Sequence, residues 1–217
     1  SVRDELDDHG NILKTEKKLY QVKWIAGFPF NRLVKIQGQD LSPEELKKQE
    51  QKEERFRQKL TAVDTLKMAA RKEGWVTPQL LERYQFVVQE RTVLSNRATL
   101  VLTFKPKDAQ LPSETARDRV LNRLAGTIWV DEADADTARL SVRLVEPIVL
   151  GWFGILGALS RCDVSLARQR LPEGVWVNAR QSLLIHIRKL TATRHFRTTE
   201  ESSGFKLAEA APDSASS

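Results

Sequence analysis

Hydrophobic and polar residues alternate with a period of two along much of this chain, and this pattern constrains the fold more than any other feature. Successive side chains of a strand point to opposite faces, so the pattern is typical of strands with one buried face. We expect about nine or ten such strands. The alternating segments lie around Tyr20–Trp24, Val34–Ile36, Tyr84–Val88, Ala98–Phe104, Ile128–Val130, Leu140–Leu144, Cys162–Leu166, Val175–Ile187 and Thr191–Thr199.

Short turns join most of these segments without an intervening helix. Turn-forming residues occupy Asp7–Asn11, Ser95–Asn96, Asp131–Asp136 and Pro172–Gly174. Sequential hairpins of this kind predict an antiparallel meander, and long strands curl as their twist accumulates. The predicted fold class is α+β, mainly β, with one domain over residues 1–206 and a disordered tail over residues 207–217.

A helical insertion is expected over about residues 43–83, between the second and third of these strands. Ser42 is placed to cap a helix, Pro43 suits its first position, and Glu45 completes a capping box. The segment then runs to Leu60 with a charged and amide-rich middle, so most of its surface should face solvent. A second short helix is predicted over Ser113–Leu124. We expect helices after the second strand to cover the concave face of the sheet.

Composition excludes several classes of protein. The chain has 217 residues, and its single cysteine rules out an internal disulfide framework and a cysteine-based zinc site. The net charge of +6 comes without a block of five or six like charges, so no nucleic-acid partner is expected. The longest apolar run, Ile148–Leu159, is shorter than the roughly 20 residues of a membrane-spanning helix.

The residues give no sign of catalysis, and we expect neither an enzyme nor a cofactor. The chain lacks a G-x-S-x-G nucleophile motif, a phosphate-binding glycine loop and an H-E-x-x-H metal motif. His186 falls at the polar phase of the Val175–Ile187 strand, where we expect it at the surface or a pocket rim, and His195 lies near the end of the last strand. Cys162 falls on an apolar strand face, where we expect it to pack. The acidic turn of Asp131, Glu132, Asp134 and Asp136 invites a calcium interpretation, but it departs from the EF-hand pattern, so we expect a solvated turn and no metal.

Aromatic and apolar residues supply the candidate binding site. We expect an apolar cavity lined by Trp24, Phe86, Phe104, Trp129 and Trp176, with an ordinary filled core as the alternative. The Ile148–Leu159 segment is unusually apolar for a connection. It is interpreted either as a buried loop or as a gate or membrane contact made by Trp152, Phe153, Ile155 and Leu156. Basic residues from Arg168 to Arg197 form either a positive face or a solvated outer sheet face.

Several short motifs resemble those of the bacterial lipoprotein-carrier superfamily (LolA/LolB-like). Gly126–Asp131, followed by an acidic turn and Ala138-Arg139-Leu140, is similar to the G-T-x-W-V-D…x-R-L hairpin of that group. Gly174-Val175-Trp176 is similar to its G-x-W-x-P strand, although position 178 is Asn, and Phe196-Arg197 resembles its last strand. Leu41–Glu45 resembles the L-S-P-E-E helix start of uncharacterised members.

The resemblance implies a half-open barrel with helices over an apolar cavity, in a periplasmic or cell-envelope protein. Its members bind lipids or lipoprotein acyl chains, or sense envelope components. Our first hypothesis is therefore a non-enzymatic protein that binds a lipid, an acyl chain or a lipidated peptide, with contact to a membrane surface. The alternative is a protein-interaction or sensing module with a self-filled cavity, which docks a partner through the helix over residues 43–60.

Overall fold

The computed structural model describes residues 1–26, 28–60, 81–107, 115–150, 157–188 and 192–206. Twelve strands form one open sheet, and every strand pairing in it is antiparallel. The mainly β class and the antiparallel arrangement are confirmed. The strands are β1 (Val2–Leu6), β2 (Ile12–Ile25), β3 (Phe28–Ile36), β4 (Gln39–Asp40), β5 (Tyr84–Leu94), β6 (Arg97–Pro106), β7 (Leu124–Asp131), β8 (Thr137–Leu144), β9 (Ile148–Leu150), β10 (Gly157–Arg170), β11 (Trp176–Arg188) and β12 (Thr193–Glu201).

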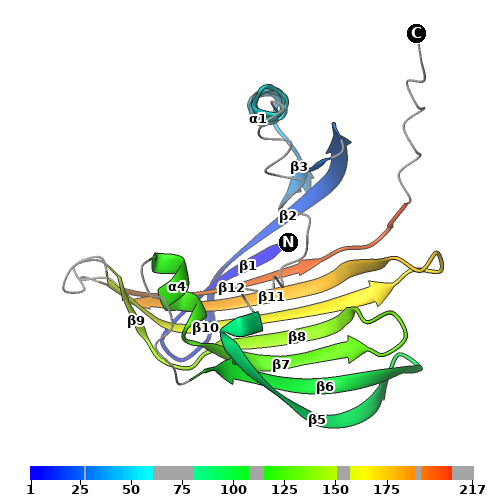
Figure 1. Cartoon of the computed structure of the whole chain (residues 1–217). Coiled ribbons are helices and arrows are strands. Elements are labelled where there is room, and N and C mark those ends of the chain that lie inside the picture. The colour runs from blue at the N-terminus through cyan, green and yellow to red at the C-terminus, as the bar shows by residue number, and fades with distance from the viewer. Residues whose placement is uncertain (27, 61–80, 108–114, 151–156, 189–191, 207–217) are drawn as a thin grey trace.

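The order of strands across the sheet is β4-β3-β2-β1-β12-β11-β10-β8-β7-β6-β5, and β9 pairs with β10 beside this path (Figure 1). Most neighbours in space are neighbours in sequence, as the short turns predict. There are two exceptions: β1 lies between β2 and the last strand, β12, and β8 pairs with β10 although β9 separates them in sequence. β4 and β5 are the two edges, so the sheet is not closed.

Tight turns set the register of the hairpins. Ser95 and Asn96 both have positive φ, 52° and 61°, which is the geometry of a two-residue type I′ turn. The β5–β6 hairpin predicted at this turn is confirmed, with Leu94 opposite Arg97. Three strands were not foreseen: β1, β4 and β9. β1 has a polar sequence, and β4 and β9 are only two and three residues long.

The register gives the sheet one apolar face and one polar face. We call the apolar face the side that carries the directly paired row Phe104, Gly126, Val142, Val164 and Leu183. The polar face is the other side. There a row of hydroxyl side chains crosses six adjacent strands in direct register, from β6 to β12: Thr103, Thr127, Ser141, Ser165, Ser182 and Thr199.

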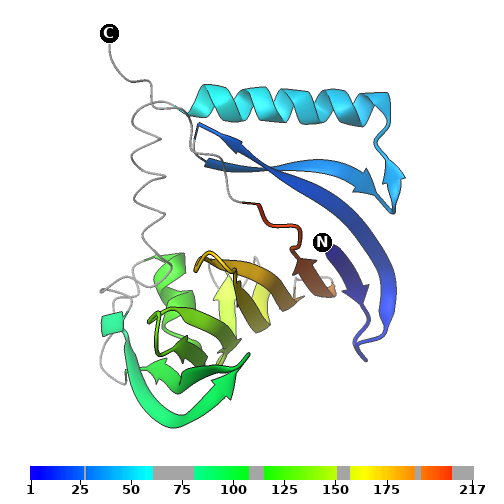
Figure 2. The same ribbon diagram turned by 90° about the vertical axis from the view of Figure 1, so that its right-hand side faces the viewer.

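The sheet bends sharply at β2. The first half of β2 pairs with β1 and its second half pairs with β3, so β2 and β3 rise away from the rest of the sheet and leave it half open (Figure 2). Arg3 lies opposite both Thr198 and Glu16. Thr198 pairs with Leu183 of the apolar face, so Glu16 lies on that side of the sheet too. Side chains alternate along β2, so Tyr20, Val22 and Trp24 lie on the same side as Glu16.

Helix α1 (Pro43–Lys59) begins with the predicted cap. The Ser42 hydroxyl accepts a hydrogen bond from the Glu45 backbone N–H, and the Glu45 carboxylate accepts one from the Ser42 N–H, at 2.8 Å. The helix ends one residue before the predicted Leu60, which is its C-cap. The remainder of the predicted insertion, at residues 61–80, lies outside the described residues.

The sequence predicted that the helices after the second strand cover the concave, apolar face. α1 instead packs on the polar side of β2 and β3. Lys23 forms an ion pair with Glu53 at 3.8 Å, and the Phe30 ring lies 5.2 Å from the Phe56 ring. Lys23 and Phe30 are directly opposite each other, so their side chains share one face. Trp24 is the next residue after Lys23 on β2, so it points to the other face. Figure 2 shows α1 on the far side of β2 and β3 from the remaining strands.

Helix α4 (Ala116–Leu121) ends before the predicted Leu124 because β7 already begins at that residue, and the predicted start at Ser113 lies outside the described residues. Thr115 and Asp118 form its capping box. The ends of the apolar Ile148–Leu159 segment form a small hairpin in which β9 pairs with the start of β10. Ile148 is buried, at 2% exposure, so this end of the segment belongs to the core.

Candidate binding faces of the sheet

The apolar face carries large side chains that the described elements do not fully bury. Phe86 is 39% exposed and Val88 is 59% exposed, both on the edge strand β5. Most of the others on this face are half-buried. Over β6 to β12 they are Leu102, Phe104, Ile128, Leu140, Val142, Cys162, Val164, Leu166, Leu183, Ile185 and Phe196.

An aromatic cluster joins this face to α4. The Tyr84 ring lies 5.2 Å from Phe104, and Phe86 lies 5.9 Å from Phe104. The Tyr84 hydroxyl donates a hydrogen bond to the Leu121 carbonyl at 2.8 Å. Burial raises the pKa of Tyr84, so the phenol keeps its proton at neutral pH and remains a donor. Two of the five predicted lining residues, Phe86 and Phe104, are therefore in contact.

The other three predicted lining residues lie elsewhere. Trp24, on β2, is 58% exposed and belongs to the raised arm of the apolar face. Trp129 is on the polar face, because its neighbour Ile128 pairs with Leu102 on the apolar face. The guanidinium of Arg139 lies 5.6 Å from the Trp129 ring. The prediction that these residues line one cavity is wrong for Trp129. The alternation in the sequence already indicated that Trp129 and Ile128 point to opposite faces.

Trp176 lies at the acidic turn between β7 and β8. Its indole N–H donates a hydrogen bond to Asp134 at 2.9 Å. Asp134 also pairs with Arg97, at 3.1 Å, and with Arg170. Trp176 is thus part of a polar network at the end of the strands and is not in the aromatic cluster of Tyr84, Phe86 and Phe104.

The acidic turn is exposed at residues 132–135, as predicted, but arginines also bind its aspartates, which the sequence did not predict. Asp131 is 1% exposed and accepts two hydrogen bonds from Arg97, one of them at 2.7 Å. Its carboxylate also accepts from the backbone N–H groups of Ala133 and Asp134. Hydrogen bonds from Arg97 are the main cause that lowers the pKa of Asp131 from 3.8 to about 2. Asp136 pairs with Arg168. These arginines come from β6 and β10, so sequence spacing alone could not have matched them to the turn.

The two strand-end histidines face each other. His186 and His195 are directly opposite on β11 and β12, with ring centroids 4.2 Å apart. His195 Nε2 lies 2.9 Å from Asp8 Oδ1, and its Nδ1 has no partner among the described residues. Burial, with a smaller contribution from His195, lowers the pKa of His186. Burial also raises the pKa of the Cys162 thiol, which keeps it protonated and unreactive.

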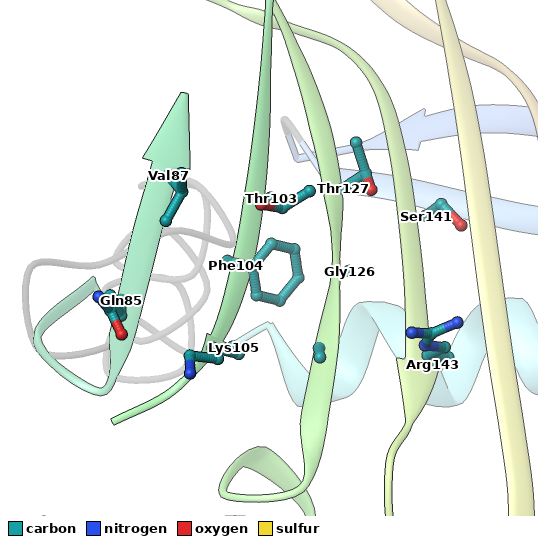
Figure 3. A pocket seen from close by; sticks show the side chains of 10 residues that line it. Gln85, Val87, Thr103, Phe104, Lys105, Gly126, Thr127, Ser141 and Arg143 are labelled. Atoms are coloured by element: carbon teal, nitrogen blue, oxygen red, sulfur yellow. The ribbon is translucent and has the colours of Figure 1, made fainter. Parts of the chain in front are cut away.

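A hollow of about 470 Å³ opens on the polar face of β5–β8 (Figure 3). It is lined by two outward side chains from each of these four strands, together with Phe104 and Gly126. Two of the lining residues, Lys105 and Arg143, are cationic. No sequence motif signalled this site, because its residues come together only through the cross-strand register.

The remaining predictions concern metals and the gate. No cluster of three or more His, Cys, Asp or Glu side chains suited to a metal occurs among the residues that the structure describes. In the same part of the chain, no helix is long and apolar enough to cross a membrane. The predicted gate residues Trp152, Phe153, Ile155 and Leu156 lie outside the described residues. Comparisons of the chain with protein-family models, curated proteins and solved structures found no match.

Proposed function

We propose that the protein binds an apolar ligand, a lipid or an acyl chain, on the apolar face of its half-open sheet, without catalysing a reaction. The observation that carries this proposal is the extent of the apolar face. It runs from β5 to β12, is interrupted by Arg3 of β1 and Glu16 of β2, and resumes on the raised arm formed by β2, where Val22 is 57% exposed. α1, the longer described helix, packs on the other side.

Hydrocarbon burial supplies the driving force. Each methylene moved from water to an apolar surface contributes about 0.8 kcal/mol, so an acyl chain has several kcal/mol available from contact with this face. The motifs similar to lipoprotein carriers make lipoprotein acyl chains the first natural ligands to consider. A periplasmic or envelope setting, and contact with a membrane surface, belong to the same proposal.

Two neighbouring valines of β5 offer a matched test. Val88 points to the apolar face and Val87, 46% exposed, points to the polar face. We expect Val88→Glu to weaken binding of the neutral fluorescent probe N-phenyl-1-naphthylamine at least tenfold, because a carboxylate would have to lose water against hydrocarbon. Palmitate should displace the probe from the unmodified protein.

Val87→Glu is the control, since it adds the same charge to the same strand on the opposite face. It should leave the probe affinity within about twofold. Equal losses in the two variants, or no probe binding by the unmodified protein, would contradict the assignment of the apolar face. Thermal unfolding of both variants checks that neither loses its fold.

The alternative, a protein-docking role for α1, is favoured by the position of that helix on the outside of β2 and β3. Glu53 is engaged with Lys23 and Arg57, so it holds α1 in place. Glu50 and Glu54 line a shallow surface groove on the helix with Gln51, Arg55 and Gln58. If α1 docks a partner, Glu50→Lys with Glu54→Lys should abolish co-purification of that partner and leave probe binding unchanged.

A further inference from the structure

The hollow on the polar face is a small grid built by four consecutive strands. Gln85 pairs with Lys105, and Ala125 pairs with Arg143. Phe104 lies opposite Gly126, so Lys105, the next residue along β6, lies beside Ala125. These four side chains form one row of the grid. The second row is Val87, Thr103, Thr127 and Ser141.

The centre of the grid is small, and its flanks are cationic. Ala125 and Thr127 occupy the middle strand, β7, and leave space between the longer side chains. Lys105 and Arg143 lie one strand away on either side, which separates their backbones by about 10 Å. Figure 3 shows the two side chains on opposite sides of β7. Both can turn inward over Ala125 toward one bound group.

Neither cation is neutralised by a carboxylate of the described residues. This distinguishes them from Arg97 and Arg170, which are paired with aspartates. Asp163 lies directly opposite Arg143 on β10, but its carboxylate forms its ion pair with the Arg161 guanidinium, at 2.6 Å. Two unpaired cations that share one hollow favour a ligand that carries negative charge.

Hydroxyl donors complete the site. The Thr103 hydroxyl accepts a hydrogen bond from Gln89 at 2.8 Å, which leaves its own proton free to donate. The Thr127 and Ser141 hydroxyls lie beside it in the same row and make no side-chain hydrogen bond within the described part of the chain. Hydroxyls, an ammonium and a guanidinium are the donors that phosphate oxygens use in proteins.

We propose that this hollow binds a phosphate group, with Lys105 and Arg143 on either side of it and the hydroxyls of Thr103, Thr127 and Ser141 as donors. The chemistry is common to soluble phosphate compounds and to phosphate headgroups of lipids. The site lies on the opposite face of the sheet from the proposed apolar site and does not depend on it.

The test compares two double variants of equal charge. Lys105→Met with Arg143→Met removes the two cations of the hollow, whereas Lys47→Met with Lys52→Met removes two exposed cations of α1. Inorganic phosphate binding is measured by isothermal titration calorimetry at low salt. Co-sedimentation with vesicles of phosphatidylcholine, with and without phosphatidic acid, tests the headgroup. We expect the first double variant to lose at least tenfold in affinity and the second to retain it.

A single variant separates the hollow itself from the overall charge. Ala125→Leu fills the centre of the grid, keeps the net charge and should weaken phosphate-group binding by at least tenfold, with thermal unfolding as the check on folding. Binding of inorganic phosphate would identify a soluble compound as a sufficient ligand, and binding of the phosphatidic acid vesicles alone would identify a lipid headgroup. Equal binding by both double variants, or no binding of either probe, would overturn the proposal.

Discussion

Replacing Gly126 with alanine should lower the free energy of unfolding by about 3 kcal/mol or more. A Cβ built on Gly126 would lie 2.0 Å from the backbone carbonyl oxygen of Ser141 and 3.0 Å from two carbons of the Phe104 ring. Gly126 pairs with both Phe104 and Val142, so the strain would fall on the β6–β7 and the β7–β8 ladders. Urea unfolding at neutral pH would measure the loss.

The cause can be assigned with a second substitution. Phe104→Ala removes the ring but leaves the Ser141 carbonyl in place, so it should not rescue Gly126→Ala. Ala125→Ser serves as the control on the adjacent residue, because its hydroxyl would enter the open hollow on the polar face. We expect this control to stay within about 0.5 kcal/mol of the unmodified protein. A Gly126→Ala variant with unchanged stability would contradict the prediction, because it would show that β7 can move away from Ser141 and Phe104 without a loss of folding free energy.

Replacing Asp131 with alanine should cost about 2 to 3 kcal/mol at pH 7. The change leaves the Arg97 guanidinium and two backbone N–H groups of the turn without the carboxylate that accepts from them. Glu132 provides a control in the same turn. Its ion pair with Arg91, whose side chain is 78% exposed, should contribute little, so we expect Glu132→Ala to change stability by less than about 1 kcal/mol.

The loss at Asp131 should also depend on pH in a defined direction. The folded protein holds the pKa of Asp131 near 2, below its ordinary value of 3.8, so folding favours the charged form. The stabilisation is therefore complete above about pH 4 and disappears as the pH falls through 2. The difference between the unmodified protein and Asp131→Ala should shrink over this interval in urea unfolding. A difference that stays constant from pH 7 to pH 2 would contradict an ionic role.

The sequence predicted the strands, turns and helix starts that depend on residues close together along the chain. The alternation located nine strands, Ser95-Asn96 located a hairpin, and Ser42-Pro43 with Glu45 located the start of α1. Each of these signals depends on residues that are close in sequence. The predicted apolar face of the sheet follows from the same alternation, which also indicates that Trp129 and Ile128 point to opposite faces.

The sequence could not predict contacts that depend on register between strands. The pairing of Asp131 with Arg97, and of Asp134 with Arg170, requires knowing which strand ends meet at the β7–β8 turn. The hollow between Lys105 and Arg143 likewise exists only because β5–β8 pair in one particular register. The side of β2 on which α1 packs is decided by Phe30 and Phe56, which meet only after the chain reverses twice.

The place of β1 in the sheet has a consequence for the order of folding. Val2 pairs with Thr199 on one side and with Lys17 on the other, so the first strand of this sheet is paired with the last one along the chain. Contacts so distant in sequence make a domain fold slowly, because a long loop must close before they form. Until β12 is available, β1 presents an unpaired edge, and an open strand edge of this kind can pair with the wrong strand.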